Sequence, residues 1–520
     1  MTIRKIRISS QILFLLFFLY LFWKTSEVSG RWIPVDLYLR ADPLLALLGM
    51  IAARVLIPSM LASIAVIAAT IILGRVFCGW VCPMGTTLDL VSRIGRTVNR
   101  FKLRQFQHLK YYLLSGFFLS AVLGYQLVYN LDPIALTTRI FTVALLPIVV
   151  TTFNYIFNLL FQIEPLQFQL LGLQSSLIDS LLPLEPYYFQ TAFILGLIFA
   201  VIIGFELYSR RVFCQVVCPL GAMLGLMGMP QRLKRKVNQD CTECGECQLV
   251  CKTNAIPEDF SQTEFRECIQ CFNCVDVCAP GATIINFRGE AKSCVTDFTR
   301  RKLLLSGVGG IAAASLTGIS YIRPEQASKL IRPPGSTPEA EFVERCVRCY
   351  QCLRACATSG NFLQPSLLEG GWAGLLTPYG VAGTGYCEYN CTLCTEVCPS
   401  GAIHPLNVEA KHKTVIGLAY FDKNRCLPYA NGTPCIVCEE HCPTPKKAIE
   451  FKQEEYQYRD GSKKMIKFPF IVEELCIGCG ICEFKCPVEG ARGVCITNKN
   501  QQRFRPGGQF GKDNKDYGNE

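Results

Sequence analysis

The sequence predicts an α-helical membrane domain of about four to five spans joined to α+β ferredoxin-like polyferredoxin modules. Three observations predict this combination. The chain has 520 residues, more than one soluble domain normally holds. Half of its residues are hydrophobic and only 18% are charged, and its mean hydropathy is positive. It also contains 30 cysteines, nine of them within residues 241–294, and such local density requires either disulfides or metal.

Several common redox cofactors do not fit this sequence. A haem b between membrane helices needs axial histidines, and all four histidines lie outside the long apolar runs. There is no C-x-x-C-H motif for haem c and no G-x-G-x-x-G on a strand–helix unit for a flavin or a nicotinamide. The electron carriers are therefore expected to be thiolate-bound or diffusible.

The first half of the chain contains the candidate membrane spans, each of which needs about 20 apolar residues. Residues 8–23 follow a basic N-terminus and show no small-residue cleavage site, so we expect an anchor helix rather than a secretory signal. Further apolar runs cover 57–74, 110–129 and 187–208. The apolar stretch 140–163 and the amphipathic stretch 166–186 either both lie on the outer leaflet or both cross, and we expect the former.

Basic residues predict the orientation, because lysine and arginine mark the cytoplasmic side. Residues 75–110 carry seven of them against one acid, and residues 210–236 carry six and no acid. Residues 130–187 contain no lysine and only Arg139. Both basic segments are therefore expected inside, with 130–187 outside, in a bacterial or archaeal inner (cytoplasmic) membrane. The net charge of +11 reflects this topology and does not indicate nucleic-acid binding.

An internal repeat accompanies the two basic segments. The sequence from Arg75 to Gly85, RVFCGWVCPMG, recurs 136 residues later from Arg211 to Gly221 as RVFCQVVCPLG. Each copy follows an expected span at its cytoplasmic end. A pseudo-symmetric pair would bring together the thiols of Cys78, Cys82, Cys214 and Cys218. We expect redox-active or cluster-binding thiols, which could hold a further cluster; the alternative is buried cysteines inherited from a duplication.

The next cysteines have the spacing of a bacterial two-cluster ferredoxin, in which the fourth cysteine of each run ligates the other cluster. This assigns Cys241, Cys244, Cys247 and Cys278 to one cluster and Cys268, Cys271, Cys274 and Cys251 to the other.

The last part of the chain has four more runs: Cys346/Cys349/Cys352/Cys356, Cys387/Cys391/Cys394/Cys398, Cys426/Cys435/Cys438/Cys442 and Cys476/Cys479/Cys482/Cys486. Structural zinc favours two C-x2-C pairs separated by a spacer, and these runs fit that pattern poorly. Disulfides at such spacing would be strained or scrambled. We therefore expect six 4Fe-4S clusters in all, with Cys294 and Cys495 left over as structural cysteines.

Between the two cluster regions, residues 299–305 read TRRKLLL and precede a weakly apolar, Ala/Gly-rich stretch. They resemble a twin-arginine export signal placed in mid-chain, and the alternative is an ordinary basic flank of an anchor helix. Either interpretation makes 303–322 a fifth span, with 209–302 cytoplasmic and 323–520 extracytoplasmic. The polar, Gly-rich end of the chain is expected to be disordered.

These expectations divide the chain into five parts: 1–236, the membrane domain; 237–295, the two-cluster module; 296–323, the twin-arginine-like segment and fifth span; 324–500, the four-cluster domain; and 501–520, the disordered tail.

With these motifs in place, residues 1–295 resemble a NapH-type quinol dehydrogenase membrane ferredoxin, and residues 296–500 resemble a NapG/MauM-type ferredoxin. The resemblance implies electron flow from the membrane quinol pool to a periplasmic terminal reductase or small carrier, with quinol as the substrate. A further resemblance, to four-cluster subunits of molybdenum oxidoreductases, implies that the first run of 324–500 pairs with the fourth and the second with the third. Under that pairing Cys486 joins the Cys346 site, Cys356 the Cys476 site, Cys442 the Cys387 site and Cys398 the Cys426 site.

Two other functions remain open: a reverse wire from an outside dehydrogenase to quinone, and a NosR-like maturation or regulatory protein. The sequence shows no catalytic site for a small substrate. Acids near the expected membrane surfaces could accept quinol protons. We expect them to be solvated loop charges instead, and assign none as catalytic: Asp132, Glu164, Asp179, Glu185 and Glu206.

Overall fold

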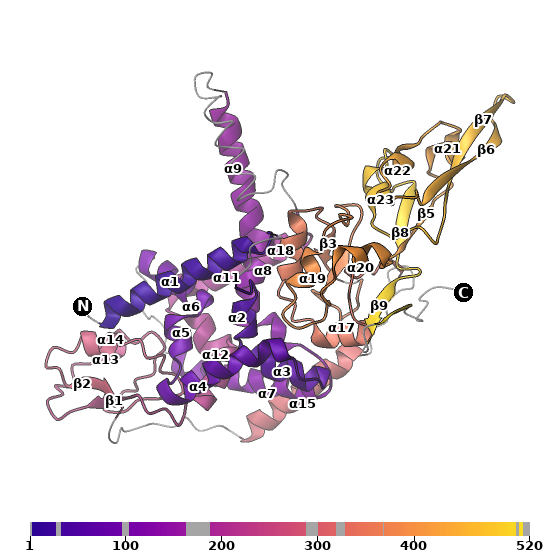
Figure 1. Cartoon of the computed structure of the whole chain (residues 1–520). Coiled ribbons are helices and arrows are strands. Elements are labelled where there is room, and N and C mark those ends of the chain that lie inside the picture. The colour runs from indigo at the N-terminus through magenta and orange to yellow at the C-terminus, as the bar shows by residue number, and fades with distance from the viewer. Residues whose placement is uncertain are drawn as a thin grey trace.

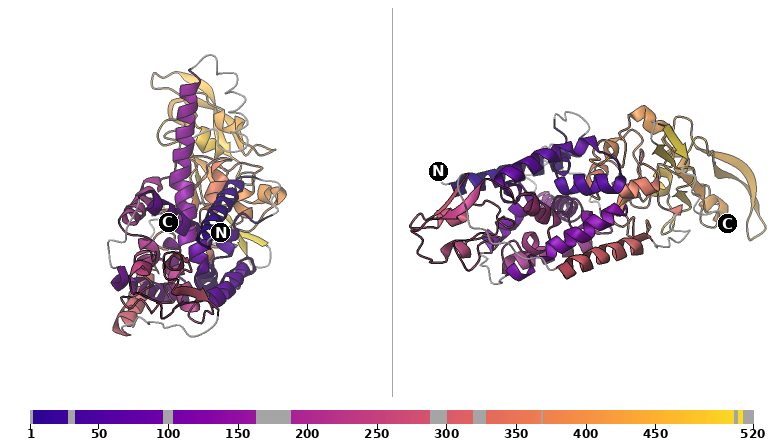
Figure 2. Two further views of the ribbon diagram at one scale, coloured as in Figure 1. Left: turned by 90° about the vertical axis from the view of Figure 1, so that its left-hand side faces the viewer. Right: turned by 90° about the horizontal axis from the view of Figure 1, so that it is seen from below.

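The computed structural model describes residues 3–27, 33–95, 103–162, 188–287, 300–318, 328–367, 369–505 and 509–512. A helical domain occupies the middle of an elongated molecule (Figures 1 and 2). A small cysteine-rich module lies at one end of it, beside the start of α1, where Arg4 pairs with Asp276 at 3.0 Å. A larger module lies at the other end, where Thr25 bonds Gln351 at 3.0 Å. We call these the inner module, residues 234–287, and the outer module, residues 328–512.

The helical domain consists of long helices that run between the two modules and short ones at their ends. The long ones are α1 (Ile3–Lys24), α4 (Ser63–Leu73) after the 3-10 helix η1 (Pro58–Ala62), α7 (Leu109–Val122) and α11 (Ala192–Tyr208). The short ones are α2 (Leu37–Arg40), α3 (Pro43–Ala53), α5 (Val76–Trp80), α6 (Pro83–Ile94), η2 (Leu103–Phe106), η3 (Val128–Asn130), η6 (Phe213–Val217) and α12 (Pro219–Met227).

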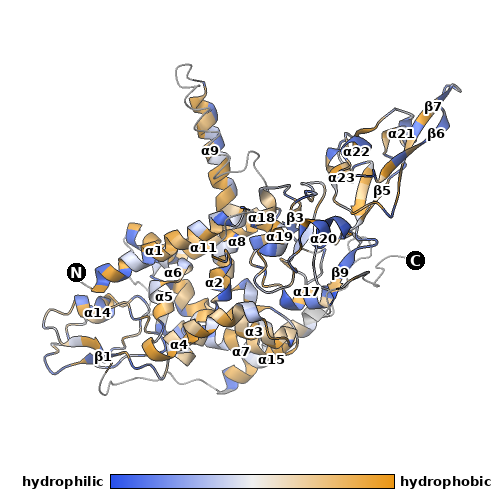
Figure 3. Cartoon of the chain, in the orientation of Figure 1, coloured by the Kyte–Doolittle hydropathy of each residue, from blue (hydrophilic) through white to orange (hydrophobic). Residues whose placement is uncertain are grey.

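The long helices consist largely of hydrophobic residues (Figure 3), and many of their large apolar side chains are exposed. Leu13, Ile64 and Phe193 are 65%, 57% and 80% exposed. Within the described residues, two helices are long and apolar enough to cross a membrane, Ile3–Lys24 and Pro133–Leu160, and three shorter apolar helices accompany them. The expected four to five spans therefore remain a prediction.

The second of these helices is built from α8 (Pro133–Ile140), the π-helical turn η4 (Phe141–Leu145) and α9 (Leu146–Leu160). Its α9 part leaves the bundle at a steep angle and projects away from it (Figures 1 and 2). It covers most of the stretch 140–163 that we expect on the outer leaflet. The partner stretch 166–186 lies outside the described residues.

Helix α15 (Arg300–Gly318) carries the twin-arginine-like sequence and packs along α7. Gly310 and Gly116 meet at the contact, where a Cβ on Gly310 would lie 2.3 Å from the Gly116 carbonyl oxygen. Such small-residue contacts are typical of helices that associate in membranes. The length and apolarity of α15 do not place it among the two long candidate spans, so a fifth span stays a prediction.

The two modules have the small mixed folds expected of ferredoxin-like units. In the inner module β1 (Lys234–Val237) pairs antiparallel with β2 (Thr283–Asn286), beside α13 (Glu246–Leu249) and α14 (Asn273–Asp276). The strands of the outer module form antiparallel pairs: β3 (Leu363–Pro365) with β4 (Pro378–Gly380), β5 (Leu418–Phe421) with β8 (Val494–Thr497), β6 (Ile449–Gln457) with β7 (Lys463–Ile471), and β9 (Gln502–Arg505) with β10 (Gln509–Lys512). Its helices are α17 (Glu339–Arg345), α18 (Gln351–Ala357), α19 (Leu393–Glu396), α20 (Val408–Lys413), α21 (Leu427–Asn431), α22 (Val437–Glu440) and α23 (Ile481–Lys485).

The β9–β10 hairpin corrects the prediction of a disordered tail for residues 502–505 and 509–512, while 506–508 and 513–520 lie outside the described residues. The Phe504 amide donates to the Ser336 carbonyl at 2.9 Å, and the Phe504 ring packs on His404 with centroids 3.8 Å apart. Arg503 pairs with Glu339 at 3.4 Å. The polar composition did not predict this hairpin, because the Phe504 ring and the Arg503 ion pair hold it in place and it has no apolar pattern.

Candidate iron–sulfur sites

The two copies of the repeat place their cysteines alike. Cys78 lies in α5 and Cys214 in η6, while Cys82 and Cys218 each stand just before a helix that begins with proline. Cys82 and Cys218 are buried, and each lies close enough to the other copy's thiols to interact electrostatically with them. The structure therefore brings the four thiols together as the repeat predicts.

Each copy also sends an arginine to the other copy. Arg211 donates to the Cys78 carbonyl at 2.8 Å and to the Gly85 carbonyl at 3.2 Å. Arg75, its counterpart, reaches Gly221, where a Cβ would lie 2.8 Å from the Arg75 guanidinium. Gly85 and Gly221 are also counterparts, so a local pseudo-twofold axis relates the thiols of one copy to those of the other. A side chain at either glycine would displace an arginine.

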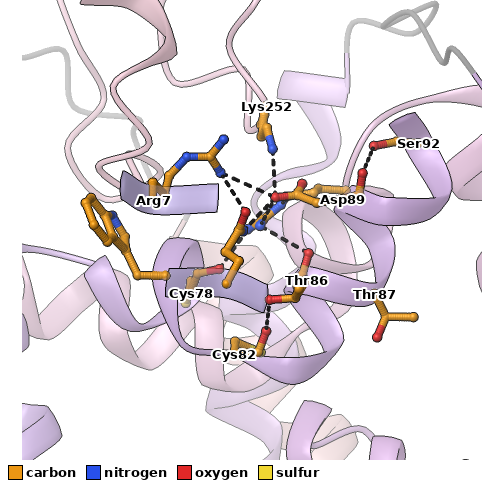
Figure 4. A network of polar contacts seen from close by, with 12 residues as sticks. Arg7, Cys78, Cys82, Thr86, Thr87, Asp89, Ser92 and Lys252 are labelled. Atoms are coloured by element: carbon orange, nitrogen blue, oxygen red, sulfur yellow. Dashed lines mark hydrogen bonds and ion pairs between the residues drawn. The ribbon is translucent and has the colours of Figure 1, made fainter. Parts of the chain in front are cut away.

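Positive charges exceed negative ones around the thiols. On one side Asp89 is bonded by Arg211 at 2.8 and 2.9 Å and by Lys252 at 2.7 Å, with Arg7 at 3.5 Å (Figure 4). On the other side Glu267 accepts from Arg75 at 3.1 Å, from Tyr111 at 2.8 Å and from Lys110.

The remaining acid is Glu206, which is 1% exposed; neither of its carboxylate oxygens has a hydrogen-bond partner within the described residues. The set thus has five cations, namely Arg7, Arg75, Lys110, Arg211 and Lys252, against three acids, namely Asp89, Glu206 and Glu267. Buried charge needs compensation, and an iron–sulfur cluster held by four thiolates is anionic, so the donor set and its charge both fit such a group.

The inner module touches this site directly. The Trp80 indole donates to the Gln270 carbonyl at 2.9 Å, and its ring meets Phe272 edge-on with centroids 6.2 Å apart. Cys251 lies within electrostatic reach of Cys268, Cys271 and Cys274, which matches the ligand set assigned from spacing.

The other inner set is placed in part. Cys247 lies near Cys241 and Cys244, and its sulfur accepts a hydrogen bond from Arg235 at 3.4 Å. Cys278 follows α14 by two residues, and its place in this set stays a prediction.

The outer module corrects the pairing implied by resemblance. Cys346, Cys349, Cys352 and Cys398 line one cavity. Cys356 lies beside Cys387, Cys391 and Cys394. The first run therefore pairs with the second, because the short helices α18 and α19 lie side by side: α18 carries Cys352 and Cys356, and α19 carries Cys394 and ends two residues before Cys398.

The third and fourth runs pair in the same way. Cys426, Cys435, Cys438 and Cys486 line a second cavity. Cys442 lies within electrostatic reach of Cys476 and Cys479, and Cys482 completes that group. Sequential neighbours thus form both pairs.

The cysteines of all four outer sites fit thiolate ligation. Among the 29 cysteines in the described residues, none forms a disulfide; Cys294 lies outside them. Burial raises the pKa of Cys346 to about 11 and that of Cys438 to about 12, so without metal both thiols would be protonated at neutral pH. Metal binding must release those protons. Within the described ranges, no group of three or more His, Cys, Asp or Glu side chains is placed so that it could hold a metal ion.

The four outer sites form a row. Cys352 and Cys356 share α18, which joins the first site to the second, and the Cys387 amide donates to the Cys479 carbonyl at 2.8 Å, which joins the second to the third. Cys482 lies near Cys438 of the last site.

The first outer site rests on the helical domain. Arg354, on the same short helix as Cys352, lies over the Phe22 ring at 5.3 Å. From there a group of packed aromatic rings leads inward: Phe22 and Phe18 both meet Phe141, and Phe18 meets Tyr38 at 5.4 Å. Tyr38 lies within electrostatic reach of Cys82. Aromatic side chains thus fill the space between the repeat thiols and the first outer site.

Two buried carboxyls also lie at the outer end. Asp42 and Asp132 each precede a proline, cap α3 and α8, and accept two backbone N–H groups through Oδ1. Both are 0% exposed; burial and the neighbouring Asp132 raise the pKa of Asp42, and burial raises the pKa of Asp132.

The interpretation of these acids as solvated loop charges is therefore wrong for Asp132 and Glu206, which are buried. Glu164, Asp179 and Glu185 lie outside the described residues. A second Asp-Pro pair in the sequence, at Asp42, was the signal that could have identified Asp132 as part of the duplication.

A large cavity opens beside the repeat. It has a volume of about 800 Å³ and lies between α1, α4 and α5, within the usual range for small-molecule sites. Its walls are apolar apart from Ser10, Tyr38 and Trp80, whose side chains donate to backbone carbonyls. Val76, Phe77 and Val81, the neighbours of Cys78 and Cys82, form one wall.

Comparison with known proteins supports iron–sulfur chemistry at several of these places. The chain matches a family described as "4Fe-4S binding domain" at residues 55–102 and 191–238, which contain the two repeat copies, and a second family of that description at 469–490. It is 36% identical to the ferredoxin-type protein NapG of Escherichia coli over 197 residues, which is 36% of this chain and 82% of that protein.

Two further relatives extend the comparison. The methylamine utilization ferredoxin-type protein MauM of Methylorubrum extorquens is 34% identical over 199 residues, 36% of this chain and 84% of its own length. An uncharacterised protein of Methanocaldococcus jannaschii is 26% identical over 290 residues, 56% of this chain and 99% of its own. No solved structure matches.

Proposed function

The chain belongs to the family of ferredoxin-type proteins that includes NapG and MauM, and on that premise we propose that it is a membrane-bound iron–sulfur electron-transfer protein that acts as a quinol dehydrogenase. Iron–sulfur electron transfer follows from the family and the 4Fe-4S domains. The proposal adds that quinol is oxidised at the inner end of the helical domain. It further adds that electrons leave the outer module for a periplasmic reductase or small carrier.

One observation carries the proposal: cysteine sites lie at both ends of a helical domain whose outer surface is apolar, and four more thiols lie inside that domain. A soluble ferredoxin would not need an apolar belt between its cluster sites. The basic residues of the inner side, which include Arg93, Arg210 and Lys236, favour a cytoplasmic inner module and an extracytoplasmic outer module.

The cavity beside the repeat is the proposed quinol site. Its volume and apolar walls suit a quinol ring and the start of its isoprenoid tail. The hydroxyls of Ser10 and Tyr38 donate to the Trp80 and Phe14 carbonyls, at 3.3 and 2.6 Å. Their oxygens therefore have lone pairs left to accept hydrogen bonds from the quinol hydroxyls.

The ligand proposal covers seven sites. Six 4Fe-4S clusters would be held by the 24 cysteines of the two modules, and a seventh by Cys78, Cys82, Cys214 and Cys218. Each cluster, when bound, supplies a one-electron carrier. The protein's own contribution is to hold the thiols in place, to balance their charge with Arg75 and Arg211, and to exclude water from the site.

The test is reduction of the purified protein by menaquinol in proteoliposomes. The readout is the bleaching of the clusters' visible absorbance. Ala69→Phe on α4 would fill the cavity, and Ile71→Phe, on the exposed face of the same helix, is the matched control. We expect Ala69→Phe to abolish bleaching by menaquinol while bleaching by dithionite persists, and Ile71→Phe to behave as wild type. Equal menaquinol reduction in all three proteins would contradict a quinol site in this cavity.

The opposite direction of flow has one observation in its favour, because several relatives carry names that refer to methylamine utilization. The same proteoliposomes decide the direction. If the clusters are reduced only by an added outside donor and then reduce menaquinone, electrons flow from the outer module to the quinone pool.

A further inference from the structure

A second cavity lies on the other side of α1, between α1, α6 and the inner module. Its volume is about 220 Å³. Five cations and one carboxylate line it: Arg4, Arg7, Arg93, Arg210, Lys252 and Asp89. This cavity is separate from the apolar one beside the repeat, and no quinol contact is assigned to it.

One carboxylate, Asp89, serves several of these cations, since Lys252 bonds it at 2.7 Å and Arg7 lies 3.5 Å from it. Asp89 already receives both nitrogens of Arg211, which lies outside the cavity lining, and Arg4 pairs with Asp276. Arg7 is 2% exposed, and its Nε has no hydrogen-bond partner within the described residues. A buried guanidinium with an unused donor, beside further cations, calls for an anion.

The cavity is also amphiphilic. Arg4, Arg7, Ile8, Gln11, Ile12 and Leu15 follow one another along one face of α1, so the wall changes from basic to apolar with depth. Ile12 and Leu90 are 52% and 51% exposed, which leaves the apolar wall open on the outer surface of the bundle.

We infer that this cavity binds the phosphate headgroup of an anionic phospholipid, with its acyl chains along Ile12, Leu15 and Leu90. The inference rests on the membrane placement of the proposed function. Basic pockets between helices at the cytoplasmic surface bind such headgroups. A quinol fits less well, because it is neutral and five cations line this cavity.

The site adjoins the repeat thiols through two contacts. Arg211 donates to the Asp89 carboxylate and to the Cys78 carbonyl. A phosphate in the cavity would share Arg7 and Lys252 with Asp89 and would hold α1 against α6. The lipid is therefore a positioning ligand for the thiol loop and takes no part in electron transfer.

The experiment uses the full chain in nanodiscs of phosphatidylcholine with or without phosphatidylglycerol, and native mass spectrometry to count bound lipid. Arg93→Gln with Arg210→Gln removes two cations of the cavity. Arg232→Gln with Lys236→Gln removes two cations near β1 and is the control of equal net charge. We expect the cavity variant to lose about 30-fold in phosphatidylglycerol affinity and the control to lose little.

Each alternative outcome has its own signature. Equal retention of phosphatidylglycerol by both variants, or equal retention of phosphatidylcholine by the wild type, overturns the lipid site. If inorganic phosphate alone displaces the bound lipid at millimolar concentration, the site takes free phosphate instead. Iron content and menaquinol reduction are measured on the same samples, so misfolding and failure of the proposed function are recognised separately from loss of lipid.

Discussion

The two ends of the helical domain have the same backbone pattern but carry different chemistry. At the inner end, each repeat copy supplies two cysteines and an arginine, and the surrounding charge is positive. At the outer end, each copy supplies an aspartate before a proline, and burial raises the pKa of both Asp42 and Asp132. The nearby arginines bond carbonyls there: Arg139 donates to the Tyr129 carbonyl at 2.7 Å, and Arg348 to that of Gln126.

This difference shows how the duplication is used. The inner end has a complete set of four ligands from the helical domain alone. The outer end has no thiols of its own, and the first outer site is completed by Cys346, Cys349, Cys352 and Cys398 of the outer module. The distance from Asp to Arg is 33 residues in the first copy and 79 in the second, so a 46-residue insertion, which includes α9, separates the two ends of the second copy.

The largest expected effect tests the ligand pairing at the outer end. Cys346→Ser with Cys398→Ser removes two ligands of one site, and we expect a loss of about four irons per chain. Cys346→Ser with Cys486→Ser affects two sites, and we expect a loss of about eight. Iron analysis and electron paramagnetic resonance measure both variants. The reverse order of losses would restore the pairing of the first run with the fourth.

The next effect tests the inner end. Cys82→Ser with Cys218→Ser removes one thiol from each repeat copy, and we expect about four fewer irons per chain. Cys495→Ser is the control, because that thiol lies outside all the proposed sites. Unchanged iron in the double variant would mean that the repeat thiols hold no cluster, and the two ends would then differ less than we propose.

Spacing and charge allowed much of this site to be predicted. The repeat predicted that Cys78, Cys82, Cys214 and Cys218 meet, because similar motifs that follow the same end of two helices are brought together by pseudo-symmetry. Ferredoxin spacing predicted that Cys251 joins Cys268, Cys271 and Cys274. The loop between Cys251 and Cys268 is short, so the run that begins at Cys268 is the only neighbouring run that the Cys251 thiol can join.

The remaining features depend on contacts distant in sequence. Pairing in the outer module was not predictable because its runs are separated by loops of similar length, and spacing does not state which helices lie side by side. Asp132 and Glu206 read as ordinary polar residues until helix packing buries them. The β9–β10 hairpin depends on Arg503 finding Glu339, 164 residues away.

A matched pair of substitutions compares the carboxyls of the two ends. Asp89→Asn breaks buried ion pairs with Arg211 and Lys252, and we expect it to destabilise the protein by about 3–5 kcal/mol. Asp132→Asn replaces a buried carboxyl, whose pKa is raised by burial, with a neutral amide of the same shape. We expect it to cost less than about 1 kcal/mol. Thermal unfolding in detergent measures both; equal losses would mean that Asp132 is charged and paired as Asp89 is.

The smallest effect concerns a carboxylate within the outer module. Glu339 forms ion pairs with Arg332, at 2.5 Å, and with Arg503, and both guanidinium groups lower the pKa of its carboxyl. The pair with Arg503 holds the β9–β10 hairpin in place. Because the folded-state pKa lies below the unfolded value of about 4.5, the stabilisation is present above that pH and is lost as pH falls through the folded value. Glu339→Gln should therefore cost about 1 kcal/mol at pH 7, and the difference from wild type should shrink in acid. Glu455→Gln, which removes an exposed pair with Lys463, should change little at any pH. A difference for Glu339→Gln that stays constant down to pH 3 in urea unfolding would show that packing of the hairpin, rather than charge, gives Glu339 its effect.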